Sequence, residues 1–176
     1  IILDTGSSKE LYSQDYFVKQ QADYFFNNSQ KKEELFLKRM NIVNTYVPQR
    51  GKLLDVGCAI GTFLKIANEN NYEVKGIEIS GFAATYAKNK YGIGVACGEF
   101  SRERFLNDKF DVITMWDVVD HSEDPRTFLS DAFSLLADGG FLFVETAMED
   151  SFVYQFSRYI YKLSFGLIRS PVVKGH

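Results

Sequence analysis

The chain has 176 residues, 45% of them hydrophobic, and its 20 Lys and Arg residues against 23 Asp and Glu residues give a formal net charge of −3. This length suits a single domain, and a nearly balanced, mildly acidic charge lacks the positive field that draws a protein to nucleic acid. The two cysteines, Cys58 and Cys97, make no disulfide framework, and no run of about 18 apolar residues is present. We therefore expect a cytoplasmic protein with reduced thiols, Cys97 in its core and no membrane-spanning helix.

The first fifty residues divide into a polar stretch and a helical pattern. Residues 1–15 lack apolar periodicity, which predicts a loose arm. From residue 16 to residue 47, apolar residues recur three, four and seven positions apart, a spacing typical of amphipathic helices. The polar residues up to Ser29 interrupt this pattern and predict the start of a second helix, which Pro48 ends. We therefore expect an N-terminal arm and helical cap over residues 1–50.

Short apolar segments alternate with helix-length segments over residues 51–150. The expected strands are 52–56, 73–79, 93–97, 110–115 and 141–145. The expected helices are 62–70, 81–91 and 125–136, with a turn at 138–140. Strands of unbroken apolar residues separated by helices predict a parallel sheet covered on both faces. Because crossovers between parallel strands are right-handed, the expected fold class is α/β with a doubly wound, mostly parallel sheet.

Residues 151–176 differ in composition from the rest of the chain. They contain no Asp or Glu, and four Lys and Arg residues accompany an aromatic, apolar stripe at helical spacing. This pattern predicts a basic aromatic helix. Three roles stay open for it: a cap over the substrate, a core or interface helix, or a helix that rests on a membrane surface.

One segment combines a strand, a glycine turn and the start of a helix. The strand runs into Gly57, and Gly61 ends the turn. Ligands that resemble nucleotides bind at this edge of a doubly wound sheet, because helix N-terminal N–H groups and a backbone without side chains converge there. The next expected strand carries Glu78, 21 residues after Gly57, where a carboxylate can accept hydrogen bonds from both hydroxyls of a ribose.

The residues around the turn indicate which nucleotide is bound. A dinucleotide fingerprint requires glycine at positions 57, 59 and 62, but the chain has Ala59 and Thr62, and no Gly-Lys-Ser/Thr phosphate loop is present. Asp55 instead stands two residues before Gly57. A carboxylate here would repel a pyrophosphate and would suit a ligand with a cationic end. S-adenosylmethionine (SAM), which carries an ammonium and a sulfonium but no phosphate, fits this requirement.

Residues 51–147 resemble the class I SAM-dependent methyltransferases, particularly the small-molecule branch related to ubiquinone and menaquinone ring methylases. Four segments carry the resemblance in the order and spacing of that family: LLDVGCAIGTFL, VKGIEIS, FDVITMWDVVDHSEDP and LLADGGFLFVETA. The resemblance implies a Rossmann-like methyltransferase fold, a SAM-binding core over residues 51–150, and methyl transfer to a small-molecule acceptor. The family's sheet ends in antiparallel strands that the sequence lacks, so we expect these strands to be missing and the chain to be a fragment of a longer protein.

The resemblance also implies which residues contact the cofactor. They lie at the ends of the expected strands and in the turns that follow: Asp55, Gly57, Cys58, Ala59, Gly61, Glu78, Ile79, Glu99, Phe100, Met115 and Trp116. Those in the first strand and turn would surround the methionine end of SAM, and Cys58 would do so through its backbone. Glu78 would hold the ribose and Ile79 would pack near the adenine. Glu99 would lie near the adenine amino group, beside a backbone N–H offered by Phe100. Met115 and Trp116 would contact the cofactor and line the substrate side.

Three further positions depend on the resemblance. Arg39 would reach the carboxylate of the cofactor, as an arginine before the first motif does in some relatives. Ala59 replaces a glycine that is common in the first motif, so its methyl group could crowd the cofactor. Asp120 stands where relatives usually carry Glu, and a shorter acid on a loop should be tolerated.

His121 is the candidate general base, because an imidazole titrates near neutral pH and His121 follows the fourth expected strand. A base is needed only if the acceptor carries a proton with a high pKa, and a structural role in the loop is the alternative. The sequence supports no metal site.

Two other functions stay open at this point. The chain could be a catalytically inactive binding subunit with a methyltransferase fold, which the alanine in the glycine turn favours. It could also be an NAD-dependent or nucleotide-sugar enzyme, which the absent third glycine disfavours. We expect a small-molecule partner and no nucleic acid. The acceptor and the oligomeric state do not follow from the sequence.

Overall fold

The computed structural model describes residues 29–146, all of which belong to one compact unit that ends at Thr146. Its strands are β1 (Lys52–Val56), β2 (Glu73–Glu78), β3 (Val95–Cys97), β4 (Phe110–Trp116) and β5 (Leu136–Glu145). They form one sheet in the order β3-β2-β1-β4-β5, in which every pairing is parallel. The expected α/β fold with a parallel sheet is confirmed. Because the strand order reverses at β1, the carboxyl ends of β1 and its neighbours form the edge where such folds bind ligands.

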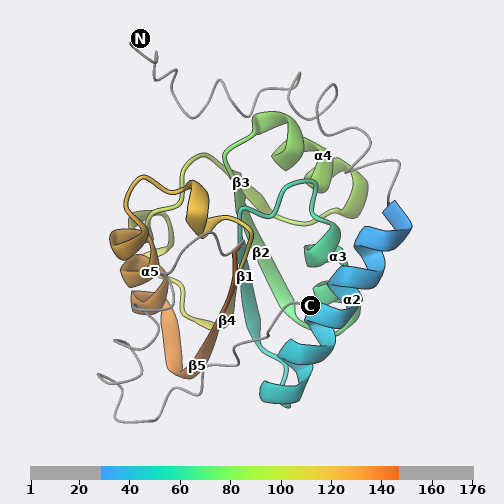
Figure 1. Ribbon diagram of the computed structural model, residues 1–176, viewed down its shortest axis with the longest axis horizontal. Helices are drawn as coiled ribbons and strands as arrows, with labels where there is room; N and C mark the ends of the chain where they lie inside the picture. Colours follow the sequence, from blue (N-terminus) through green and yellow to red (C-terminus); the bar gives the residue numbers. More distant parts are fainter. Residues whose placement is uncertain (1–28, 147–176) are drawn as a thin grey trace. The chain divides into compact units, whose positions relative to one another are not determined.

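Helices cover both faces of the sheet (Figure 1). They are α2 (Ser29–Tyr46), α3 (Thr62–Glu69), α4 (Gly81–Tyr91) and α5 (Pro125–Ser134), with short 3-10 helices η3 (Arg102–Phe105) and η4 (Val119–His121). In Figure 1, α2 and α3 lie on one side of the sheet and α5 on the other. Within residues 29–146, no helix combines the length and the apolar character needed to cross a membrane. The arm and helix expected before Ser29, and the basic helix expected over residues 151–176, lie outside the described residues.

Capping groups explain why most elements begin and end within two residues of the expected positions. The Ser80 hydroxyl accepts a hydrogen bond of 3.3 Å from the Ala83 N–H at the start of α4, and Gly92 ends that helix at φ +69°. Asp124 begins α5, where its Oδ1 accepts hydrogen bonds from the N–H groups of Arg126 and Thr127 at 3.1 and 3.3 Å. These interactions involve near neighbours along the chain, so the sequence predicts them well.

The turn expected at residues 138–140 is wrong, because these residues lie inside β5. Leu136 pairs with Phe110, and Phe141 pairs with Val112, so five steps along β5 face only two along β4. The Asp-Gly-Gly residues therefore form a bulge rather than a connection between elements. These residues favour a turn, but pairing with β4 on either side keeps them within β5, so they form an irregularity in the strand.

Three smaller expectations also differ from the structure. The helix expected to reach residue 136 ends at Ser134, because β5 begins two residues later. The third strand begins at Val95 rather than residue 93. Cys97 is exposed, not in the core, because it is the last residue of the edge strand β3.

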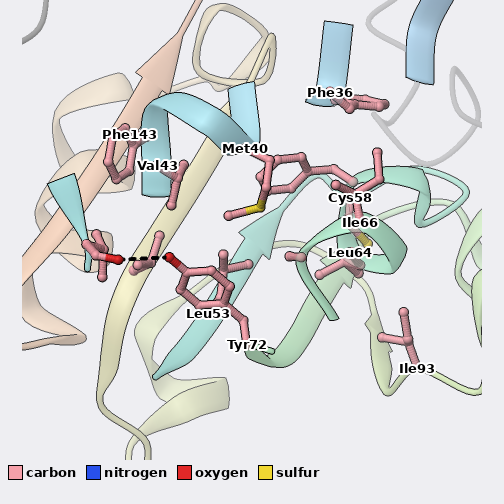
Figure 2. Packing of buried hydrophobic residues seen from close by; sticks show 14 residues of the cluster. Phe36, Met40, Val43, Leu53, Cys58, Leu64, Ile66, Tyr72, Ile93 and Phe143 are labelled. Atoms are coloured by element: carbon pink, nitrogen blue, oxygen red, sulfur yellow. Dashed lines mark hydrogen bonds between the residues drawn. The ribbon is translucent and has the colours of Figure 1, made fainter. Parts of the chain in front are cut away.

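One hydrophobic cluster joins α2 to α3 and the sheet (Figure 2). The buried residues that α2 and its end contribute recur at helical spacing: Phe36, Met40, Val43 and Val47. They share the cluster with buried residues of the strands and of α3: Leu53, Phe63, Leu64, Ile66, Ala67, Val112 and Phe143. Just after the C-terminal end of α2, the Tyr72 hydroxyl lies 3.5 Å from the Val47 carbonyl oxygen, the contact drawn as a dashed line in Figure 2. Complete burial of one such side chain contributes about 1.5–3 kcal/mol, so the core holds α2 firmly.

The alternation of side chains along the strands places polar groups on the face that α2 and α3 cover. Val112 belongs to the hydrophobic cluster, so Thr114, two residues later, points to the same face. Asp55 pairs with Thr114 in register, and Trp116 pairs with Glu145 at the ends of β4 and β5. Two acids, a hydroxyl and an indole therefore gather on one face at the carboxyl edge of the sheet.

Candidate active site

The turn between β1 and α3 contains three residues in the left-handed region: Gly57 at φ +71°, Ala59 at φ +48° and Gly61 at φ +79°. Glycine adopts this conformation freely, whereas a Cβ makes it unfavourable by about 1–2 kcal/mol. Ala59, which stands in place of a glycine, is therefore strained. Its backbone N–H donates a hydrogen bond of 2.8 Å to Glu78 Oε2, which ties the turn to the end of β2.

Two neighbouring segments approach this turn so closely that they exclude a side chain from it. A Cβ added to Gly57 would lie 2.7 Å from Val118 Cγ2, and one added to Gly61 would lie 2.7 Å from Ala87 Cβ. Val118 belongs to the loop after β4, and Ala87 belongs to α4. The glycines therefore serve both the backbone conformation and the close packing of two other elements on the turn.

Glu78 ends β2 with its carboxylate buried and bound by backbone groups. Oε2 accepts the hydrogen bond from Ala59, and Oε1 accepts one of 2.9 Å from the Ser80 N–H. Burial raises the pKa of Glu78, and the hydrogen bonds from Ser80, Ala59 and Ile79 oppose that shift. Each carboxylate oxygen has a second acceptor position. Glu78 is therefore held in one orientation and can still accept a hydroxyl hydrogen from a ligand.

Asp55 is almost completely buried, with 2% of its surface exposed. Its Oδ1 accepts a hydrogen bond of 2.7 Å from the Thr114 hydroxyl. Burial raises the pKa of Asp55 to about 7, the Thr114 hydrogen bond and the charge of Arg39 oppose the shift, and the charge of Glu78 adds to it. The carboxyl group therefore lies close to the midpoint of its titration at neutral pH, where a nearby cation would favour the ionised form.

Cys58 packs within the turn. The side chain is buried, and its burial together with the charges of Asp55 and Glu78 raises the pKa of the thiol well above its ordinary value. A thiol held in the uncharged form is a poor nucleophile, which supports a packing role. Among residues 29–146, no three His, Cys, Asp or Glu side chains are grouped so that they could hold a metal ion.

The loop after β3 lies beside the end of β2, because the Gly98 N–H donates a hydrogen bond of 2.9 Å to the Glu78 carbonyl oxygen. Glu99, which follows, is exposed. The ring of Phe100 meets Phe128 of α5 edge-on, with ring centroids 5.1 Å apart. The loop that carries Glu99 and Phe100 thus begins beside the end of β2, and Phe100 is anchored by packing.

Met115 and Trp116 end β4 on opposite faces of the sheet. The side chain of Met115 is fully buried, so a ligand at the strand end would reach its backbone rather than its sulfur. Trp116 is partly buried, and its ring meets Phe63 edge-on, with centroids 5.3 Å apart. The indole Nε1 is buried and has no hydrogen-bond partner among the described residues. Its hydrogen-bonding capacity is therefore not used within residues 29–146.

The candidate base His121 lies in η4, in the loop after β4, as the sequence predicts. Its side chain is 60% exposed, and its Nε2 lies 3.8 Å from Asp120 Oδ2. A contact this long and exposed restrains the imidazole only weakly. His121 is therefore exposed to solvent, and its orientation depends on the loop that carries it.

Arg39 is buried in α2, and the structure binds it to two carboxylates. Nε donates to Glu145 Oε2 at 2.9 Å, and Nη2 donates to Glu145 Oε1 at 2.7 Å and to Asp117 Oδ2 at 2.9 Å. Its guanidinium also lies 5.3 Å from the Phe36 ring centroid and 5.0 Å from that of Trp116. Burial opposes its charge, but the hydrogen bonds that it donates to Glu145 and Asp117 outweigh this effect and raise its pKa. The expected contact of Arg39 with a cofactor carboxylate stays a prediction.

Sequence reasoning missed Thr114, Asp117, Val118 and Glu145, which complete the surroundings of the expected site residues. A hydroxyl in an otherwise apolar strand was a signal for Thr114, since it had to meet a polar partner. Asp117 and Glu145 lie at strand ends, where ligand-binding groups are common. Their shared partner Arg39 is far away along the chain, so no local pattern could identify the cluster.

Comparison with known proteins agrees with this geometry. A family profile described as "Methyltransferase domain" matches residues 27–176. Similar curated proteins include the ubiquinone biosynthesis O-methyltransferases of Coxiella burnetii, 25% identical over 131 residues, and of Pseudomonas fluorescens, 26% identical over 136 residues. These matches cover 71% of this chain but only 54% and 59% of the two relatives. The chain thus spans little more than half the length of the curated relatives it matches.

Solved structures share the fold. A plantazolicin methyltransferase in complex with SAH is 18% identical, with a TM-score of 0.62 over 93% of this chain and 64% of that one. An amino pentose methyltransferase from Micromonospora echinaspora, solved with SAM bound, is 22% identical, with a TM-score of 0.57 over 66% of this chain and 51% of that one. Identities this low establish architecture alone. The family profile, however, covers most of the chain, and this protein therefore belongs to the methyltransferase-domain family.

Proposed function

We propose that this chain binds SAM and transfers its methyl group to a small-molecule acceptor. One observation carries the proposal: the buried carboxylates of Asp55 and Glu78 flank a glycine turn at the carboxyl edge of the sheet. Family membership supports it, and so does the similarity to a ubiquinone biosynthesis O-methyltransferase and to a plantazolicin methyltransferase in complex with SAH. The cytoplasmic location stays a prediction.

The residues present fit the chemistry of SAM. Asp55 is a carboxylate withdrawn from water, so an ammonium or sulfonium nearby would find a partner that solvent does not compete for. Glu78 retains acceptor positions for ribose hydroxyls. Gly57 and Gly61 add no side chain that could collide with a ligand, and Ala59 between them adds one methyl group. A dinucleotide would instead bring phosphates toward two acids.

When bound, SAM supplies an electrophilic methyl group; the new bond to the acceptor forms as the bond to sulfur breaks, and sulfur keeps the electron pair. The chain contributes alignment and the exclusion of water. Asp55 and Glu78 would orient the two ends of the cofactor. Trp116 would line the acceptor side of the site.

His121 would accept a proton only from an acceptor hydroxyl of high pKa, such as a phenol or a sugar hydroxyl. An acceptor with a neutral amine needs no such base before attack. His121→Asn is therefore expected to lower kcat for hydroxyl acceptors and to leave kcat for amine acceptors nearly unchanged. A panel of phenols, sugars and amines, with formation of S-adenosylhomocysteine (SAH) as the readout, tests this role. An equal loss of kcat for hydroxyl and amine acceptors would contradict this role.

Calorimetry with SAH on the full chain tests the proposal directly. Wild type should release heat and gain thermal stability, and Glu78→Gln should bind at least about tenfold more weakly, since a charged acceptor is lost. Glu103→Gln, which changes an exposed acid of η3, is the matched control and should bind like wild type. No heat and no stabilisation of wild type would overturn the proposal. Binding without turnover of any acceptor would favour an inactive binding subunit instead.

A further inference from the structure

We propose that Arg39 is a positioning residue that fastens α2 to the ends of β4 and β5 and thereby holds the loop of residues 117–121 over the glycine turn. The inference deepens the proposed function, since that loop borders the expected SAM site and carries His121. Arg39 would act through Asp117 and Glu145, not by contact with the reacting atoms.

Hydrogen bonds to carboxylates and contacts with aromatic rings fix the guanidinium of Arg39. Its bidentate pair with Glu145 and its bond to Asp117 engage the N–H groups in the plane. The rings of Phe36 and Trp116 lie near the guanidinium at cation–π distance. The Arg39 side chain is only 5% exposed, whereas the acids are 48% and 47% exposed. A desolvated cation with these contacts has one preferred position, and its loss removes the hydrogen bonds that Arg39 donates to both acids.

Asp117 shows why the loop needs an external restraint. It adopts φ +57°, a left-handed conformation that is unfavourable for a residue with a Cβ and persists where surrounding contacts impose it. Its side chain is held by Arg39, and its backbone N–H donates a hydrogen bond of 2.7 Å to the Glu145 carbonyl oxygen. Glu145 is thus bound to Arg39 through its side chain and to Asp117 through its backbone. The three residues form a closed set of contacts.

The restraint on Asp117 passes directly to the expected cofactor site. The next residue, Val118, packs against the turn so closely that a Cβ on Gly57 would lie 2.7 Å from its Cγ2. The Val118 carbonyl then accepts a hydrogen bond of 3.2 Å from the His121 N–H, which starts η4. A continuous series of contacts therefore runs from α2 to the glycine turn and to the candidate base.

Trp116 offers a direct readout, because it is the single tryptophan of the chain. Without any ligand, Arg39→Met should shift its fluorescence emission to longer wavelength, since loss of the guanidinium opens its environment to water. The double variant Asp117→Asn/Glu145→Gln should give a shift in the same direction while keeping Arg39. Both acids are about half exposed, so this variant is expected to fold, which circular dichroism checks. Arg39→Lys should not restore the wild-type spectrum, because an ammonium cannot make the bidentate pair.

The matched control is Arg50→Met. Arg50 also lies over an aromatic ring, that of Tyr72 at 5.3 Å, and donates a hydrogen bond to the Val47 carbonyl, at the opposite end of α2 from Trp116. Its loss should leave the emission of Trp116 unchanged. An unchanged spectrum in both Arg39→Met and the double acid variant would overturn the proposal.

Binding measurements separate this role from direct recognition of the cofactor carboxylate. The probes are SAH and 5′-methylthioadenosine, which lacks the α-amino and carboxyl groups of the amino-acid part of SAH. A positioning role predicts that Arg39→Met and the double acid variant each weaken both probes by about tenfold, and that combining the changes adds little further loss. The proposal would be overturned if Arg39→Met weakened the binding of SAH but not of 5′-methylthioadenosine, while the double acid variant bound both probes like wild type. If wild type binds neither probe, the proposed function fails, and the emission spectra still decide whether Arg39 positions the loop.

Discussion

The Thr114 hydroxyl donates a hydrogen bond of 2.7 Å to the Asp55 carboxylate, across two neighbouring strands whose register places these residues side by side. This bond stabilises the ionised carboxylate, whereas burial raises its pKa to about 7. The balance between the two effects decides how much negative charge the proposed cofactor site holds at neutral pH. It also makes the site responsive to pH.

Replacement of Thr114 by Val removes the donor and keeps the shape of the side chain. The pKa of Asp55 should rise further, and the free energy of unfolding at pH 8 should fall by about 1–3 kcal/mol, because the buried carboxylate loses a partner. At pH 5 the carboxyl group is protonated and the loss should be smaller. Urea unfolding at both pH values measures this. Thr45→Val, which removes an exposed hydroxyl bonded to the Asn41 carbonyl, is the control; equal losses for Thr114→Val at both pH values would contradict the prediction.

The raised pKa of Asp55 also predicts how stability depends on pH. Its ordinary value is 3.8 and its value in the folded chain is about 7, so between these pH values the folded state binds more protons than the unfolded state. The contribution of Asp55 to the free energy of unfolding therefore falls as pH rises from about 4 to about 7, and it is constant above that range. The wild type should lose stability relative to Asp55→Asn between about pH 4.5 and about pH 7.5 in urea titrations. The exposed Asp138→Asn is the control, and a difference that stays constant with pH would refute the assignment.

Cofactor affinity should rise with pH through the same range. A ligand cation beside Asp55 lowers its pKa, so binding releases a proton, and the affinity for SAH should increase by up to about tenfold per pH unit below pH ~7. Lys32, whose pKa burial lowers to about 7, titrates in the same range. Asp55→Asn therefore serves as the control and should reduce the dependence of SAH affinity on pH. Calorimetry in two buffers of different ionisation enthalpy counts the protons; proton uptake on binding would contradict the prediction.

Two glycines with the same backbone conformation separate strain from crowding. Gly57 has φ +71° and Gly92 has φ +69°, but a Cβ meets Val118 at Gly57 and nothing within 4 Å at Gly92. Gly92→Ala should lower the free energy of unfolding by about 1–2 kcal/mol, and Gly57→Ala by roughly 1–3 kcal/mol more. Adding Val118→Ala to Gly57→Ala should recover part of the extra loss. Similar losses for the two single variants in urea unfolding would show that Val118 does not press on the turn.

The alternation of strands and helices was predictable because it rests on local chemistry. Lys52–Val56 and Gly81–Tyr91 agree with the expected ranges, and α3 buries the apolar residues Phe63, Leu64, Ile66 and Ala67. The residues 138–140 show the limit of this reasoning. Their turn preference is real, but pairing with β4 turns it into a bulge, and that pairing joins distant segments.

The amino-acid order alone was sufficient to locate the glycine turn, the two acids beside it and the parallel arrangement of the strands, because spacing between near neighbours encodes them. The surroundings of those acids arise from contacts between remote segments. Thr114 reaches Asp55 across 59 positions, and Arg39 reaches Glu145 across 106. Desolvation and pairing of charge exist only once such segments have packed together, so the charge state of Asp55 and the role of Arg39 emerge from the folded chain.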